Sequence, residues 1–418
     1  MTTYYIDPRD GSNDNDGTSV GSAFADFAPI NWDGRTPVQP GDTVRVRGTA
    51  PVTEHLNLYE VGDSSDQTIV YEPYQDESPV IDVQQNFEHC IKLNGAQNIV
   101  IRGFEIRNAL KDGSILYGDT SADRDLTGVR LEDVTSHDNG QGGNYGSGFR
   151  ISHAKAHANL HLNCLSYDNR AGSDSDGFEI VRDAYNNRFV DCVSINDPDG
   201  GYDTFSASDK GQEFIRCVAA HSGIVSDGTT GNAADEGNGV GFKLGGGGTT
   251  GGGNYLERCI AYKCKEPSSN PGGARGSGYS DNQSSAPSEF YNCIAYDNDD
   301  VGFNGPNQPH ILRNCIAYQN GTTVSLADDV DDTYNTWNLG IDDPQFSSVD
   351  ESTTDFLRLA SGSPCIDAGV NVGMEYNGDA PDLGAYEYQE PDQETATLQY
   401  YDGSNWNPVE TTVLYRST

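Results

Sequence analysis

The chain has 418 residues, and its 64 acidic side chains outnumber the 25 basic ones, so its formal net charge is −39. This charge argues against a nucleic-acid partner, because phosphate backbones bind basic surfaces. The sequence contains no run of the roughly 18 uncharged apolar residues that a membrane span requires, and its first residues lack the pattern of a signal peptide. We therefore expect no membrane span and no signal peptide in the chain as given.

The acidic residues are spread along the whole chain, and only seven lysines stand beside 18 arginines. Such a surface suits concentrated salt, where the Debye length falls to about 3 Å and self-repulsion is screened. We expect a halophilic protein; an ordinary acidic secreted protein is the alternative. The nine cysteines are an odd number without a dense cluster, which does not indicate a disulfide framework.

The chain divides into four predicted segments. Residues 1–45 are expected to form an N-terminal cap and entry strands, and residues 46–345 a solenoid with long loops at 221–239 and 245–253. Residues 346–390 are expected to close the last coil, because an open solenoid end exposes unpaired strand edges. Residues 391–418 form a short β tail, predicted as a hairpin with an Asp-Gly turn.

A short unit with cysteine at its second position recurs along the middle of the chain, each time next to residues typical of strands and turns. Its cysteines are Cys164, Cys192, Cys217, Cys259, Cys293 and Cys315. Short β segments at a period of about 20–50 residues indicate a solenoid, and the absence of helical periodicity favours an all-β parallel β-helix. The cysteines are then expected to stack as small buried residues.

A second recurring unit is a glycine followed by an aromatic residue. Its aromatic members are Phe149, Phe178, Tyr202, Phe242, Tyr279 and Phe303. Because side chains alternate between the faces of a strand, an inward aromatic leaves the next residue facing outward. Glu179, Asp203 and Lys243 are therefore expected on successive rungs of one outer wall, about 4.8 Å apart.

Three carboxylates fall close to this wall on adjacent predicted coils: Asp176, Asp199 and Asp203. Clustered carboxylates repel one another unless a cation lies between them, and an oxygen-only ligand set favours Ca²⁺ over zinc or copper. Acidic turns are common in this chain, so the residues alone leave a calcium site and a set of solvated turns as alternatives. By contrast, His153, His157 and His161 are spaced by four, which has little meaning in strands, and we expect them at the surface or in turns.

Three segments together resemble polysaccharide lyase family nine, the pectate lyases built as right-handed parallel β-helices, over about residues 160–325. The segments are Asp176-Gly177-Phe178, Asp199-Gly200-Gly201-Tyr202-Asp203 and the strand that ends in Gly241-Phe242-Lys243. The resemblance implies that Asp176, Asp199 and Asp203 bind Ca²⁺ and that Lys243 is the Brønsted base. Gly200 stands where the family has a second consecutive aspartate, and Asp197 or Asp174 is expected to supply the missing oxygen if the site is kept.

The implied reaction is β-elimination on an acidic, uronate-containing polysaccharide. Lys243 would accept the proton at C5, which requires a lowered pKa, while the surrounding negative field raises it. The alternative for Lys243 is an ion pair with Asp203 or Glu179. Arg150, Arg170 and Arg275 are candidates for binding substrate carboxylates in bidentate contacts.

A second function class also fits the sequence. A glycan-binding adhesin or a virus tail spike would use the same β-helix for recognition, and a spike would form a homotrimer. Both functions place the protein outside the cell, either secreted or virion-borne.

Overall fold

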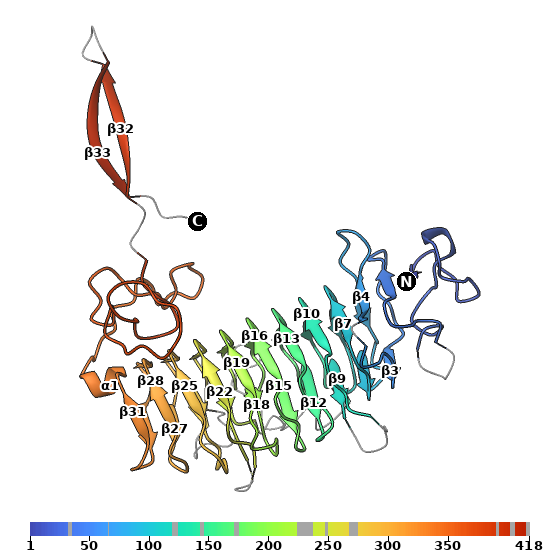
Figure 1. Ribbon diagram of the computed structural model, residues 1–418, viewed down its shortest axis with the longest axis horizontal. Coiled ribbons are helices and arrows are strands. Elements are labelled where there is room, and N and C mark those ends of the chain that lie inside the picture. Colours follow the sequence, from blue (N-terminus) through green and yellow to red (C-terminus); the bar gives the residue numbers. More distant parts are fainter. Residues whose placement is uncertain are drawn as a thin grey trace.

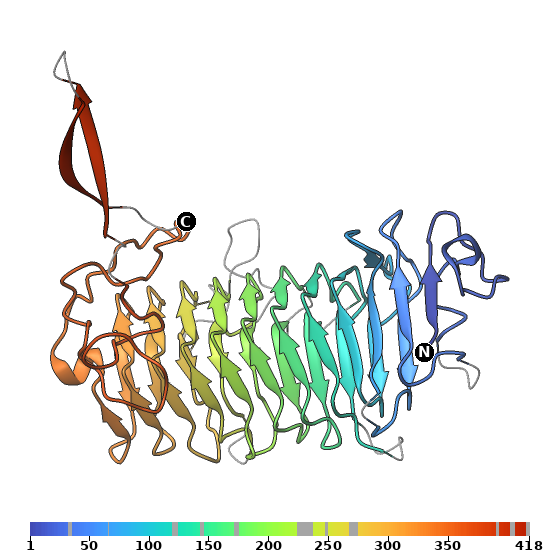
Figure 2. The same cartoon turned by 45° about the horizontal axis from the view of Figure 1, so that its top comes forward.

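The computed structural model describes the chain except residues 32–35, 66, 119–123, 143–145, 171–174, 224–236, 247–249, 267–274, 390–392, 402–405 and 415–418. Most of its described residues form a long parallel β-helix, in which the central coils each contribute one strand to each of three sheets (Figures 1 and 2). The predicted all-β solenoid is confirmed. Among the described residues, no helix is long and apolar enough to cross a membrane.

The three sheets, which we call A, B and C, run the length of the solenoid, and their neighbouring strands pair in parallel. Sheet A contains, in spatial order, β1 (Thr3–Ile6), β2 (Thr43–Val46), β4 (Ile69–Pro73), β7 (Ile99–Arg102), β10 (Arg130–Glu132), β13 (Leu160–Leu162), β16 (Arg188–Val190), β19 (Glu213–Ile215), β22 (Tyr255–Glu257), β25 (Glu289–Tyr291), β28 (Ile311–Arg313) and β31 (Asp331–Thr333). Sheet B contains β5 (Val80–Asp82), β8 (Glu105–Arg107), β11 (Thr135–His137), β14 (Leu165–Tyr167), β17 (Val193–Ile195), β20 (Val218–Ala220), β23 (Ile260–Tyr262), β26 (Ile294–Tyr296) and β29 (Ile316–Tyr318). Sheet C contains β3 (Leu56–Tyr59), β6 (Ile91–Asn94), β9 (Ser114–Tyr117), β12 (Phe149–Ser152), β15 (Asp176–Val181), β18 (Gly200–Asp203), β21 (Val240–Lys243), β24 (Tyr279–Ser280), β27 (Val301–Gly305) and β30 (Thr322–Leu326).

Single residues in the left-handed region turn the chain at the corners of each coil. Asn163, with φ 51°, lies between β13 and β14, and Asp168, with φ 53°, follows β14. Asparagine and aspartate tolerate this conformation better than other residues with a side chain. The residue before each repeated cysteine therefore marks a corner of a coil; it is Asn or Asp at four of the six, and arginine before Cys217 and Cys259.

The interior is filled by ladders of like residues. The six aromatic residues of the glycine-aromatic unit stack in sequence, with neighbouring ring centroids 4.6–5.0 Å apart. The six repeated cysteines are buried and free, as predicted. Stacked rings and small thiols give every coil the same cross-section, which keeps the strands of sheet C in register.

A ladder of buried amides, which the sequence analysis did not identify, crosses three coils and ends on a carboxylate. Asn139 Nδ2 donates to Asn169 Oδ1 at 2.9 Å, and Asn169 Nδ2 donates to Asp197 Oδ1 at 3.1 Å. The other oxygen of Asp197 accepts hydrogen bonds from Ser194 Oγ at 2.6 Å and Ser166 Oγ at 3.2 Å. Asp197 is thus a fully buried member of this ladder.

The expectation that His161 lies at the surface or in a turn is wrong. His161 is the central residue of β13, is fully buried, and stacks on Phe189 with ring centroids 4.9 Å apart. The preceding histidine, His157, stacks on Tyr185 outside the strands. The alternation of β13 turns His161 inward, where an imidazole can replace a phenyl ring.

Residues 346–390, predicted to close the last coil, follow that coil and pack part of their apolar side chains on its side. Before them, in the turn that carries α1 (Thr336–Leu339), Trp337 packs on the core near Phe303. The later segment packs Leu357, Leu359 and other apolar residues on the outward face of β23, β26 and β29. Outward isoleucines on these strands account for this placement, because they need cover from water.

Three small elements complete the description. A 3-10 turn, η1 (Val20–Ser22), lies in the N-terminal segment. Near the other end of the chain, β32 (Gln393–Tyr401) and β33 (Trp406–Leu414) pair with each other as an antiparallel ribbon.

Candidate active site

Sheet C presents a row of outward-facing positions in parallel register. Arg150 of β12 pairs with Glu179 of β15, Glu179 with Asp203 of β18, and Asp203 with Lys243 of β21. The glycine-aromatic ladder fixes this register, because each of these residues follows a stacked ring in sequence. The outer wall predicted from the sequence is therefore present in the structure.

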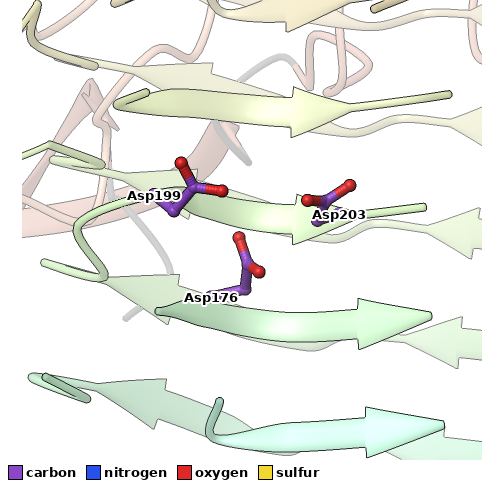
Figure 3. Close-up of side chains that lie close together, drawn as sticks. All are labelled: Asp176, Asp199 and Asp203. Carbon is purple, nitrogen blue, oxygen red and sulfur yellow. The ribbon is translucent and has the colours of Figure 1, made fainter. Parts of the chain in front are cut away.

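Three carboxylates converge on this wall (Figure 3). Asp176 begins β15, Asp199 directly precedes β18, and Asp203 ends β18. One oxygen from each lies within 4.8 Å of the others, and all three side chains are buried. In Figure 3 the carboxylate of Asp176 points toward the neighbouring strand that carries Asp199 and Asp203.

Lys243 supplies the positive charge beside these carboxylates. Its Nζ donates to Asp199 Oδ2 at 2.9 Å and to Asp203 Oδ2 at 2.8 Å. The ion pair considered as an alternative from the sequence is thus present, with Asp203 and Asp199 rather than with Glu179. Only 12% of the Lys243 side chain is exposed, so little water screens these contacts.

Asp176 is left with an unsatisfied oxygen. Its Oδ1 is buried and has no hydrogen-bond partner in the described structure. Burial, followed by the charges of Asp203 and Asp199, raises the pKa of Asp176 well above its usual range. A buried oxygen without a partner, next to two further carboxylates, fits a site for a hard cation that takes oxygen ligands.

The pKa values of Asp203 and Lys243 are shifted by the same burial and the same neighbouring charges. Burial raises the pKa of Asp203, and Lys243 opposes that rise. Burial acts against the charged form of Lys243, but Asp199 and Asp203 outweigh it and raise the pKa of the ammonium well above its usual range. Without a further cation, Lys243 is therefore protonated at neutral pH and acts as the counter-ion of the cluster.

Two residues outside the cluster hold Asp199 in place. Asn238 donates to Asp199 Oδ1 from both its backbone N–H and its Nδ2, each at 2.7 Å. Arg275 Nε in turn donates to Asn238 Oδ1 at 3.0 Å. The sequence analysis named Arg275 as a candidate for binding substrate carboxylates, whereas in the structure its Nε supports Asn238.

Asp197, one of the two residues expected to replace the missing aspartate, does not do so in the described structure. Asp197 is committed to the internal amide ladder and is not among the three carboxylates that converge. That expectation is corrected, because the corner at Asn196, with φ 58°, precedes Asp197 and its carboxylate lies inside the coil. Asp174 lies outside the described residues.

Arg150 and Arg170, the other two arginines predicted to bind substrate, lie in different parts of the coil. Arg150 Nη1 lies 3.1 Å from Glu179 Oε2, two rungs from Asp203. Glu179 also accepts a hydrogen bond from Ser147 Oγ at 2.7 Å, and burial raises its pKa to about 7. Arg170 lies in the turn after β14, and its charge acts on Asp168.

Most of the chain matches a known protein family. Residues 4–335 match the family described as Pel9A-like, right-handed β-helix region. The chain belongs to this family. The assignment agrees with the fold and with the resemblance found in the sequence, and it gives the solenoid its right-handed sense.

Two curated relatives of this Pel9A-like chain are both named as pectate lyases. It is 29% identical over 272 residues to Pectate lyase L of Dickeya dadantii (strain 3937), which covers 58% of this chain and 59% of the relative. It is 27% identical over 354 residues to Pectate lyase PEL9 of Emericella nidulans, which covers 77% of this chain and 82% of the relative. The match thus spans less than two thirds of the Dickeya protein.

Solved structures support the fold. The crystal structure of pectate lyase Pel9A superposes with a TM-score of 0.73 and 21% identity, covering 93% of this chain and 97% of that one. A rhamnogalacturonan lyase superposes with a TM-score of 0.57 and 16% identity, covering 86% and 97%. At these identities the likeness concerns the β-helix scaffold.

Proposed function

We propose that this protein is a calcium-dependent polysaccharide lyase that cleaves a uronate-containing polymer by β-elimination. The observation that supports this most is the contact of Lys243 Nζ with Asp199 and Asp203, beside the unsatisfied Oδ1 of Asp176. A base and a cation site on one exposed wall are the two parts that this elimination needs. The names of the curated relatives point to the same reaction class.

The carboxylates of Asp176, Asp199 and Asp203 would hold the cation. Bound Ca²⁺ would neutralise the substrate carboxylate and stabilise the negative charge that develops next to C5. The three aspartates argue against a pocket for an uncharged ligand, because Asp199 and Asp203 are already paired with the positive charge of Lys243.

Lys243 would act as the base. Its neutral amine accepts the proton from C5, the electron pair of that C–H bond forms the C4–C5 double bond, and the bond from C4 to the glycosidic oxygen breaks. The departing oxygen takes a proton from water. To become neutral, Lys243 must leave the two carboxylates that hold it charged, so release of this ion pair is part of activation.

The acidic surface is part of the proposal. A net charge of −39 repels a polyuronate, and salt screens that repulsion. We propose a protein that works outside the cell in concentrated salt. The adhesin or tail-spike alternative, with its homotrimer, is supported by neither the family nor the relatives, and we do not propose it.

The experiment uses polygalacturonate as substrate, with the full chain in buffered salt containing calcium. We expect the ultraviolet absorbance of an unsaturated uronate product to rise, to stop on addition of a chelator and to resume when calcium is restored. Absence of the unsaturated product with every uronate polymer tried would refute the proposal. Product formation that continues in excess chelator would refute its calcium part.

A further inference from the structure

A basic groove lies on sheet C, on the amino-terminal side of the carboxylate cluster. It has a volume of about 440 Å³, within the range of ligand sites. The charged side chains that line it, apart from a histidine, are Lys92, Lys111, Arg150, Arg182, Glu88 and Asp112. Four cationic groups thus face two carboxylates, in a chain where acidic residues outnumber basic ones by 64 to 25.

Two of these cations form no ion pair among the described residues, although the charge of Lys92 contributes to lowering the pKa of Glu88. Lys92 enters none of the ion pairs of the described residues, and the guanidinium of Arg182 contacts the ring of His153, with Nη1 3.3 Å from Nε2. Lys111 pairs with Glu88, and Arg150 lies between Glu179 and Asp112. Where negative charge is abundant, cations that form no ion pair indicate a site for an anionic ligand.

A larger cavity elsewhere on the molecule shows this feature to a lesser degree, because only one of its three arginines forms no ion pair among the described residues. It has a volume of about 800 Å³ and is also lined by arginines. However, Arg216 is paired with Asp191, Arg258 lies 4.0 Å from Glu387, and Arg358 stacks on Tyr386. Two of its three arginines therefore lie near a carboxylate, while Arg358 forms no ion pair among the described residues and Nε of Arg258 has no hydrogen-bond partner there.

The groove continues the row of positions that carries the candidate active site. Lys92 pairs in register with Ile115, Ile115 with Arg150, and Arg150 with Glu179, which is one rung from Asp203. Four rungs at about 4.8 Å separate Lys92 from Asp203 by roughly 19 Å. A linear polymer lying along sheet C would extend several sugars from the cluster into this groove.

We propose that this groove binds the carboxylates of a polyuronate, with Lys92 and Arg182 as its principal contacts, on the N-terminal side of the cleavage site. The inference rests on the proposed function for the identity of the polymer. It explains how a protein with this net charge holds a polyanion, since the local charge is reversed along the path of the chain. Arg150 links the groove to the cluster through Glu179.

The test measures binding of oligogalacturonates of increasing length by calorimetry, in a Lys243→Ala background that prevents turnover. In this background we compare the parent with Lys92→Ala/Arg182→Ala. We expect affinity for the longer oligomers to fall about tenfold, the loss of one or two charge-assisted contacts. Lys92→Gln/Arg182→Gln, which keeps the aliphatic stems, should behave alike.

A matched control removes the same charge elsewhere. Arg130→Ala/Arg188→Ala takes two exposed arginines from sheet A and leaves the groove intact. Its affinity should stay within about twofold of the parent, since distant surface charges are screened. An equal loss in the control, or none in the groove variant, would overturn the inference, as would equal binding of fully methyl-esterified oligomers.

The two proposals fail in different ways. If the unmutated chain binds oligomers through the groove but releases no unsaturated product, the lyase proposal fails and the groove assignment stands. If the groove variant, with Lys243 intact, cleaves polygalacturonate with an unchanged KM, the groove assignment fails and the lyase proposal stands.

Discussion

Gly200 and Asp176 are register partners on neighbouring rungs, and a Cβ added at Gly200 would lie 2.9 Å from Asp176 Oδ1. The missing side chain therefore leaves room for the carboxylate that has the unsatisfied oxygen. In the sequence, Gly200 appeared only as the loss of a ligand. In the structure, the absence of a side chain at Gly200 allows Asp176 to take its present position.

Gly200→Ala should weaken calcium binding without unfolding the protein. The nearest atom to the new Cβ belongs to a side chain, so Asp176 moves and the backbone is spared. We expect the dissociation constant for Ca²⁺, measured by calorimetry, to rise about tenfold, the equivalent of one weakened charged contact. Calcium affinity equal to the parent at unchanged melting temperature would contradict this reading of the pair.

Asp197→Asn should stabilise the protein above neutral pH. Burial raises the pKa of Asp197 to about 7, against about 3.9 in an unfolded chain. The folded state therefore binds more protons between these values, and stability falls as pH rises from about 4 to 7. Denaturant unfolding at pH 8 should show the variant more stable by roughly 1–4 kcal/mol.

The preceding coil shows how the asparagine would fit. Asn169 Nδ2 donates to Ser166 Oγ at 2.9 Å, and Ser194 stands at the same spacing from position 197. Asn169→Asp is the matched control, because it places two carboxylates next to each other and should destabilise the protein, more so at high pH. A stability difference between Asp197→Asn and the parent that does not vary with pH would refute the assignment.

His161→Phe should increase stability in acid. Burial lowers the pKa of His161 to about 3, and neither ring nitrogen has a hydrogen-bond partner in the described structure. An unfolded histidine binds a proton below about pH 6.5, so the parent loses stability as pH falls from about 6.5 toward 3. Thermal melts at pH 5 and pH 8 should show a larger gain for the variant at pH 5; an equal gain at both would count against a titrating His161.

Salt should raise activity on polyuronate from low ionic strength upward. The Debye length shortens from about 30 Å at 0.01 M to about 3 Å at 1 M, which removes the repulsion between two polyanions. Initial rates across this range, at fixed calcium, are the measurement. A rate that declines from the first addition of salt would contradict adaptation to high salt.

Much of the scaffold could be predicted because the coil repeats itself. Cys164 and Phe178 each belong to a series of short units, and such a series indicates the turn positions, the register and the outward row that carries Lys243, although the interval between its cysteines varies from 22 to 42 residues. The direction of individual side chains near a corner could not be predicted, because it depends on the conformation of the one residue that forms the corner. Asn196 directs Asp197 into the coil, and nothing in the acidic composition distinguishes this aspartate from Asp199.

Contacts between segments that are far apart in the chain could not be predicted from the sequence either. The covering of β23, β26 and β29 by the segment around Leu357 depends on outward isoleucines that a strand pattern cannot separate from inward ones. Likewise, the basic groove joins Lys92 to Arg182 across several coils, and neither residue stands in a motif.

The most direct test of the account is the rate of unsaturated product release by Lys243→Ala, compared with Lys265→Ala. The Nζ of Lys265 is paired with Asp299 at 2.9 Å and with none of the three clustered carboxylates, so it controls for the loss of one lysine. Because a positioned base contributes about 10²–10⁴-fold, we predict a loss of that size in kcat for Lys243→Ala and a rate close to the parent for Lys265→Ala. A Lys243→Ala protein that is folded, binds calcium and cleaves at the parental rate would contradict the central claim.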